Sequence, residues 1–153
     1  MGKRTKAREC ALQLLYQWDL TREPMDRVAG LFWQVRSSTD ETKAMAERLA
    51  RGAQRELPAL DQAITAELSN WRFDRIAAVD RNIMRIASYE LAHEPGTPAA
   101  VIIDEAVELA KRFGEADSPA FVDGVLDAVR RTVRGEGAAR RGAARTRGPA
   151  DER

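Results

Sequence analysis

The chain has 153 residues, of which 44% are hydrophobic and 32% are charged, and it carries a formal net charge of +1 with one Cys and one His. This composition is typical of one globular domain and excludes wholesale disorder, an intramolecular disulfide scaffold and a Cys/His zinc site. No apolar run reaches the roughly 18 residues that a membrane span needs, and the N-terminal segment lacks a signal-peptide cleavage site, so we expect a cytoplasmic protein.

Periodicity and chain-breaking residues predict an all-α fold in which helices follow one another throughout the body of the chain. The predicted helices cover about 3–21, 25–36, a segment from Ser38 through Ala53, a segment from Pro58 through Leu68, 75–92, 98–114 and 118–135. We expect these seven helices to form a single domain, 1–135, with two packed helical subdomains at about 1–70 and 74–135. Residues 136–153 contain almost nothing to bury, so a disordered basic tail is expected there.

Several helix starts carry capping signals. The expected caps are a Ser38–Glu41 capping box, Asp74 as an N-cap, Thr97 followed by Pro98 in the first turn, and Ser118 followed by Pro119. Gly114 and Gly135 are expected to end the last two helices.

Apolar residues at helical spacing predict which faces are buried. In the first helix the inward face is expected to contain Ala7, Cys10, Ala11, Leu14, Leu15 and Trp18, and in the second Val28, Leu31, Phe32 and Val35. Cys10 is therefore interpreted as a core residue rather than a nucleophile.

The charges are distributed unevenly along the chain. Residues 1–8 contain Lys3, Arg4, Lys6 and Arg8 with no acidic residue, and 134–153 contain six Arg against three acidic residues, so the middle of the chain is acidic. This distribution favours one surface for a polyanion and another for a basic protein, although basic ends also serve solubility alone. Because the four N-terminal cations fall within two turns of one helix, they are candidates for binding RNA phosphates.

Catalytic chemistry finds no support in the sequence. Nucleotide-binding, hydrolase and metalloprotease motifs are absent, and His93 lies in a loop without an obvious nucleophile. The chain is therefore not expected to be an enzyme or to need a metal or cofactor. Asp104, Glu105 and Glu108 form an acidic cluster, with Glu108 spaced to pair with Arg112, and this cluster suggests a solvated face or a docking surface for a basic partner.

Two phenylalanines flank the predicted start of the last helix. Free amide groups at a helix start favour phosphate, and aromatic rings can stack on unpaired bases. Spacing favours Phe113 as a core residue and leaves Phe121 open between a base-stacking role and a core role.

Four stretches of the chain resemble the NusB family of bacterial transcription antitermination factors. The first contains Arg4, Ala7, Arg8, Glu9, Cys10, Ala11, Gln13, Leu15, Tyr16 and Trp18; the others are VDRNIMRIASYEL (79–91), IDEAVELAKRFG (103–114) and DSPAFVDGVLD (117–127). Together they span 4–131, and the resemblance departs from the family at Asp123, where the family has Asn.

The resemblance implies an all-α fold of two helical bundles without catalytic activity. It implies binding to the boxA element of nascent ribosomal RNA together with the small-subunit ribosomal protein that doubles as NusE, in a complex with RNA polymerase, NusA and NusG. By position, Arg4, Lys6 and Arg8 would fall in the family's RNA-binding start. Asp117, Ser118 and Phe121 would face RNA, and Tyr16 and Asp80 would lie near the ribosomal protein.

Two alternatives remain open at the level of sequence. The chain could be an adaptor that binds proteins only, or a stand-alone relative of the NusB-like domain of ribosomal RNA cytosine methyltransferases. RNA binding that depends on residues 3–8 would separate the antitermination factor from the adaptor.

Overall fold

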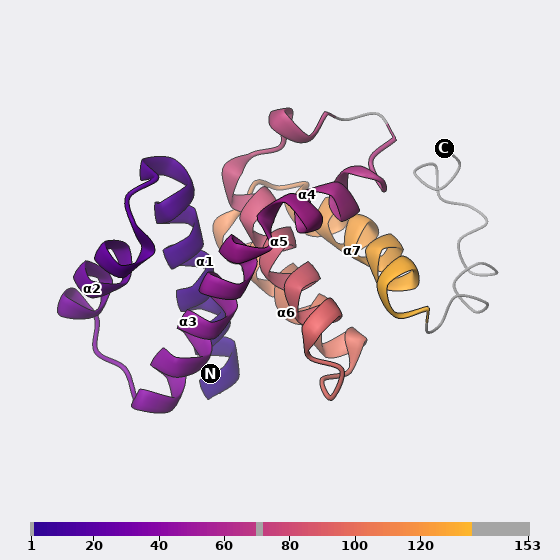
Figure 1. Cartoon of the computed structure of the whole chain (residues 1–153). Helices are drawn as coiled ribbons and strands as arrows, with labels where there is room; N and C mark the ends of the chain where they lie inside the picture. Colours follow the sequence, from indigo (N-terminus) through magenta and orange to yellow (C-terminus); the bar gives the residue numbers. More distant parts are fainter. Residues whose placement is uncertain (1, 70–71, 136–153) are drawn as a thin grey trace.

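The computed structural model describes residues 2–69 and 72–135, and within these ranges the chain forms helices and no β-strand (Figure 1). The elements are α1 (Lys3–Thr21), α2 (Met25–Val35), α3 (Asp40–Arg55), α4 (Leu57–Thr65), the 3₁₀ turn η1 (Phe73–Arg75), α5 (Ala78–His93), α6 (Ala99–Phe113) and α7 (Ser118–Arg134). The all-α prediction is confirmed, whereas the tail predicted at 136–153 lies outside the described residues. No described helix is both long and apolar enough to cross a membrane.

α3, α5 and α6 start slightly later than predicted, and their caps differ. Thr39, not Ser38, caps α3, because its hydroxyl accepts a hydrogen bond from the Thr42 amide at 3.1 Å. Asp74 lies in η1 and is no N-cap, since the buried Ile76 has extended backbone and α5 begins only after it.

The last two helices also depart from the predicted caps. Pro98 precedes α6 as its N-cap residue, so it does not occupy the first turn and Thr97 does not cap the helix. Ser118 is already the first residue of α7, and its hydroxyl accepts a hydrogen bond from the Glu115 amide at 2.9 Å. Each proline thus lies within two residues of a helix start, as predicted, but neither Thr97 nor Ser118 caps the helix that follows.

Two clusters of buried apolar side chains form the core. The first lies mainly among α1, α2 and α3, and the second mainly among α5, α6 and α7. Each cluster borrows from the other half of the fold: α5 supplies Ile86 and Tyr89 to the first, and α1 supplies Leu12 to the second. All six residues predicted for the inward face of α1 are buried, which confirms that face.

The prediction for α2 is wrong at two of its four residues. Val28 is buried and Phe32 is partly buried against the core, but Leu31 is 50% exposed and Val35 is 88% exposed. The helix lies outside the α1–α3 pair (Figure 1), and towards its end only Phe32 and Trp33 still pack against the core, both partly buried. The spacing of apolar residues predicts which side of a helix is buried, but it does not show where along its length the helix has a neighbour to pack against.

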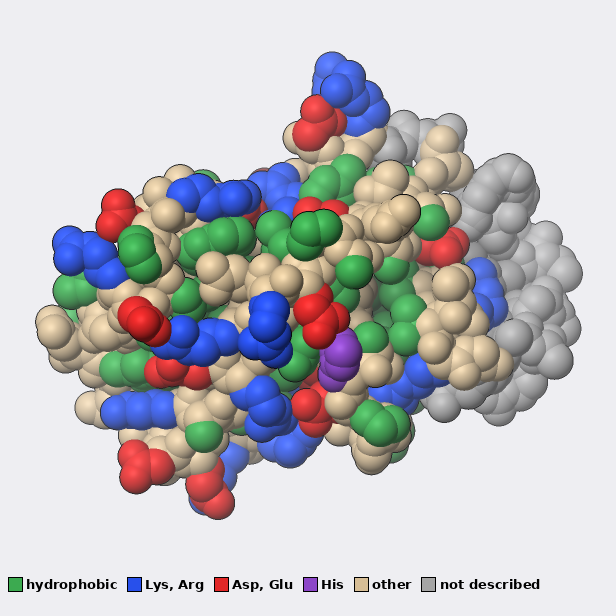
Figure 2. All heavy atoms as spheres, viewed as in Figure 1, with side chains coloured by type: hydrophobic (Ala, Val, Ile, Leu, Met, Phe, Trp, Pro, Cys, Tyr) green, Lys and Arg blue, Asp and Glu red, His purple; other side chains and the backbone are tan. Residues whose placement is uncertain are grey.

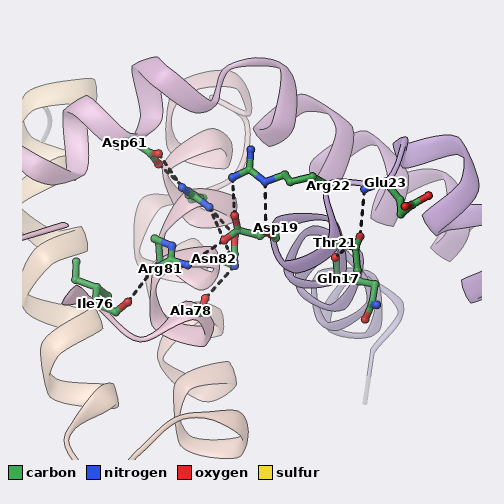
Figure 3. Close-up of polar contacts among 11 residues, drawn as sticks. Gln17, Asp19, Thr21, Arg22, Glu23, Asp61, Ile76, Ala78, Arg81 and Asn82 are labelled. Carbon is green, nitrogen blue, oxygen red and sulfur yellow. Dashed lines mark hydrogen bonds and ion pairs between the residues drawn. The ribbon is translucent and has the colours of Figure 1, made fainter. Parts of the chain in front are cut away.

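A polar network joins the end of α1 to α4 and α5 (Figure 3). One carboxylate oxygen of Asp19 accepts hydrogen bonds from Arg81 at 3.1 Å, Asn82 at 3.1 Å and Arg85 at 3.0 Å. Arg85 also donates two hydrogen bonds to Asp61 of α4, at 2.7 and 2.8 Å. This network fixes α1 against the second half of the fold with groups that are largely withdrawn from water.

Candidate nucleic-acid interface

Three of the predicted N-terminal cations lie exposed on the first two turns of α1. These are Lys3, Arg4 and Lys6. Lys3 forms an ion pair with Glu41 of α3, and Arg4 donates a hydrogen bond to the Thr97 hydroxyl at 3.4 Å. A helix that is packed on its other side therefore holds these cations close together at one end of the molecule. We call Lys3, Arg4 and Lys6 the basic start of α1.

A shallow groove of about 430 Å³ lies between the basic start of α1 and α3. Lys3, Arg4 and Arg48 contribute cations to its lining and Glu41 contributes a carboxylate. Arg48 also pairs with Glu94 at 3.2 Å. Sequence reasoning missed Arg48, because nothing in the local pattern distinguishes it from the other arginines of α3. On the face drawn in Figure 2, Lys and Arg side chains are numerous over the half formed by α1 to α3, with Asp and Glu among them.

Arg8, the fourth predicted cation, lies in the interior. Its guanidinium donates to both carboxylate oxygens of Glu90, at 2.7 and 2.9 Å, and approaches Glu105 at 3.6 Å. The Arg8 and Glu90 side chains are only 4% and 1% exposed. Burial works against the charged form of Arg8, but the hydrogen bonds and charge of Glu90 outweigh it and raise the Arg8 pKa above its ordinary value. We therefore remove Arg8 from the candidate RNA surface.

The start of α7 and the start of α5 enclose a cavity of about 510 Å³. Phe121 lines this cavity with one side and packs against the second core cluster with the other, so it has both of the surroundings that the sequence left open. Asp117 is exposed at the rim, whereas Ser118 is buried. Ser118 is thus withdrawn from any ligand, and only Asp117 and Phe121 remain candidates here.

Asp80 also faces this cavity and is not part of an open surface. One of its carboxylate oxygens accepts a hydrogen bond from the Ser118 hydroxyl at 2.9 Å, and the other is buried without a hydrogen-bond partner. Burial raises the Asp80 pKa, the bond from Ser118 partly opposes this, and the charges of Asp117 and Glu115 add to it. The sequence placed Asp80 and Ser118 on different binding surfaces, and the structure brings them into contact.

The other residues predicted to contact a protein lie on α1 and α6. Tyr16 is half-buried on α1, Asp104 is exposed on α6, and Glu105 is half-buried beside Arg8. Glu108 pairs with Lys111 at 3.0 Å and not with Arg112, which instead reaches Glu9 of α1. The acidic side of α6 therefore lies next to the buried Arg8 of α1.

The two groups of predicted RNA-binding residues lie at opposite ends of α6. Arg4 contacts Thr97, just before this helix begins, whereas Asp117 follows the end of the helix. A helix of 15 residues spans about 22 Å at roughly 1.5 Å per residue. A ligand that contacts both groups must therefore be extended. Phe113, which the sequence predicted as a core residue, is the last residue of α6 and is 37% exposed. The Arg112 guanidinium lies 4.9 Å from the centre of its ring.

The fold and this surface define a small all-α protein with a cationic helix start and a separate aromatic site at the far end of α6. The chain belongs to the NusB family, whose model matches residues 5–131. It is 44% identical over 129 residues to the transcription antitermination protein NusB of Sorangium cellulosum, covering 84% of this chain and 92% of that protein. It is 46% identical over 129 residues to the NusB of Anaeromyxobacter dehalogenans, covering 84% and 90%. These relatives are antitermination factors and not enzymes.

Solved structures agree with this assignment. T. maritima NusB superposes with a TM-score of 0.77 at 33% identity, covering 86% of this chain and 92% of that one. A second match, at a TM-score of 0.78 and 27% identity, is a crystal structure of the antitermination factors NusB and NusE in complex with dsRNA, and it covers 86% of this chain and 98% of that one. The family resemblance inferred from the four sequence stretches is confirmed.

Proposed function

We propose that this antitermination factor binds boxA-type single-stranded RNA of ribosomal RNA operons together with the small-subunit ribosomal protein NusE. The observation that carries the proposal is the basic start of α1, where a packed helix holds three exposed cations beside the groove that Arg48 also lines. Cations on a rigid element can neutralise phosphates without first being ordered. The related complex of NusB and NusE with dsRNA supports RNA and NusE as the two kinds of partner.

The acidic side of α6 suits a basic ribosomal protein. Asp104 is exposed and Glu105 is partly so, and complementary charge raises the rate and specificity of protein association. Tyr16 extends this candidate surface, while Asp80 contributes only through the cavity that it lines. In the cytoplasm, such an RNA–protein complex would join RNA polymerase, NusA and NusG.

Neutralising the basic start of α1 is the first test. In the variant Lys3→Gln/Arg4→Gln/Lys6→Gln, the slope of log affinity against log salt should become shallower by about 2, at roughly 0.7 for each lost contact to single-stranded RNA. Affinity at 0.1 M salt should fall by about one to two orders of magnitude. Fluorescence anisotropy with a boxA-type RNA, with and without NusE, measures both quantities.

A matched control removes the same charge elsewhere. Arg27, Arg55 and Arg72 are exposed and lie outside the groove and the α7 cavity. Their replacement by Gln should leave the salt slope near that of the unmodified chain. An equal loss in both triple variants would show nonspecific charge attraction. No loss in either, with NusE still bound, would favour a protein-only adaptor.

Phe121 tests the second end of the RNA surface. In Phe121→Leu an apolar side chain continues to fill the core, so the fold should lose less than about 1.5 kcal/mol, but the aromatic face is gone. If a base stacks on Phe121, RNA binding should weaken by about 1–3 kcal/mol while NusE binding is kept. RNA titration and thermal melting of the same sample separate the two effects. Unchanged RNA affinity would assign Phe121 to the core alone.

A further inference from the structure

A group of charged residues lies between the two ends of the proposed RNA surface. Glu9 of α1 accepts a hydrogen bond from Arg112 of α6 at 2.8 Å and another from Arg36, just after α2, at 3.3 Å. Arg36 also donates to the Gln13 side chain. We call Arg36, Glu9 and Arg112 the arginine bracket, because two guanidinium groups, one from the end of α2 and one from α6, approach the same carboxylate.

The arginine bracket has more positive than negative charge. The Glu9 side chain is only 9% exposed, whereas those of Arg36 and Arg112 are 28% and 41% exposed. Burial would raise the Glu9 pKa, but the hydrogen bonds and charges of Arg112 and Arg36 overcome it and lower the pKa, so Glu9 is ionised. Two cations therefore surround one anion, and the exposed Lys6 lies one turn before Glu9 on the same helix.

The structural value of this arrangement does not account for the second arginine. One arginine is enough to balance the charge of the buried Glu9 carboxylate, so a purely structural ion pair does not need both Arg36 and Arg112. Each guanidinium has five N–H donors, of which Glu9 and Gln13 engage only some. The arginine bracket thus holds two guanidinium groups in fixed positions while leaving donors directed away from Glu9.

The position of the arginine bracket suits an extended polyanion. Arg4 lies at the beginning of α6 and Asp117 beyond its end, while Arg112 reaches back from the last turn of α6 to Glu9. The Phe113 ring lies beside Arg112 and is 37% exposed, so an aromatic face adjoins the cations. A strand that passes from the basic start of α1 to the start of α7 along this side of α1 and α6 meets the arginine bracket on its way.

We propose that Arg36 and Arg112 bind backbone phosphates of the single-stranded RNA between the basic start of α1 and the α7 cavity, with Phe113 as an adjoining base-stacking face. This inference rests on the RNA-binding function proposed above and extends it by a central contact. Arginine suits this task because its planar fork can bind a carboxylate on one edge and a phosphate on another. Glu9 positions both groups and is not itself a contact to RNA.

The test compares Arg36→Gln/Arg112→Gln with the unmodified chain and with the control Arg27→Gln/Arg55→Gln. Loss of two phosphate contacts should make the salt slope shallower by about 1.4, and affinity at 0.1 M salt should fall by roughly 10- to 30-fold. The control should keep the original slope. Glu9→Gln should give tighter RNA binding, because it removes the negative charge next to the two arginines while its amide oxygen can still accept hydrogen bonds.

Other results would overturn the inference. If the variant at the basic start of α1 weakens RNA binding but Arg36→Gln/Arg112→Gln keeps both slope and affinity, the proposed function stands and the arginine bracket is a structural contact only. The same conclusion follows if the double variant melts earlier without any change in salt slope, or if it loses binding only to an acidic peptide such as poly-Glu. If neither set of variants changes RNA binding, the proposed function itself fails.

Discussion

Replacing Glu90 with Ala is expected to lower the free energy of unfolding by about 3–5 kcal/mol, because it leaves the Arg8 cation buried without its main partner. Both side chains are almost fully withdrawn from water, and two hydrogen bonds of 2.7 and 2.9 Å join them. Glu105 is 3.6 Å from the guanidinium and half-exposed, so it compensates for only part of the loss. Urea unfolding followed by far-UV circular dichroism measures the effect.

A paired replacement provides the control for the Glu90 result. Arg8→Met/Glu90→Leu removes both charges and keeps apolar volume, so it should recover most of the stability that Glu90→Ala loses. Arg8→Lys keeps the charge but cannot form the two-pronged bond and should be destabilised. If Glu90→Ala unfolds within about 1 kcal/mol of the unmodified chain, water or Glu105 must satisfy Arg8 and the pair is not a structural anchor.

Asp19 is expected to make the free energy of unfolding depend on pH in the acidic range. Burial would raise its pKa, but hydrogen bonds from Asn82, Arg22 and Arg81 and the charge of Arg85 lower it to about 2 from an ordinary value of 3.8. Because the pKa is lower in the folded state, the stabilisation is complete above about pH 4 and is lost as the pH falls towards 2. The difference corresponds to about 2 kcal/mol, at 1.36 kcal/mol for each pKa unit.

The variant Asp19→Asn isolates this contribution. At pH 6 it should unfold more easily than the unmodified chain by about 2 kcal/mol. The gap should narrow as the pH falls from about 4 towards 2, because Asp19 of the unfolded chain gains its proton near pH 4 and Asp19 of the folded chain gains one only near pH 2. Asp26→Asn, at an 88% exposed side chain, should show little change at either pH. A gap that keeps its full size at pH 2 would mean that the geometry of residue 19, and not its charge, supports the network.

The general fold could be predicted because local patterns decide it. The inward face of α1 follows from the spacing of Ala7, Cys10, Leu14 and Trp18, all of which are buried. The misassignment of Arg8 could have been avoided by the same reasoning, since it lies four residues before Leu12 and seven before Leu15, which are both buried. Arg8 belongs to the basic cluster by its charge, but its position in the helix places it on the buried face.

The candidate site could be predicted only in part, because much of it depends on residues that are distant in sequence. Glu9 meets Arg36 across 27 positions and Arg112 across 103, and no local pattern predicts such contacts. The helix starts were misplaced for a related reason: the burial of Ile76 extends the chain where Asp74 signalled a cap. The prolines predicted the helix starts more accurately, because the fixed backbone geometry of a proline acts on the adjoining turn alone.

The exchange of side chains between the two core clusters has a consequence for how the protein responds to its ligands. Since Leu12 of α1 completes the second cluster and Ile86 and Tyr89 of α5 complete the first, neither half retains a full core when the other unfolds. The described helices should therefore open as one cooperative unit in hydrogen exchange, and not as two separate foldons. A ligand bound to α1 alone would then slow exchange in α6 and α7 as well, because binding to the native state stabilises everything that unfolds with it.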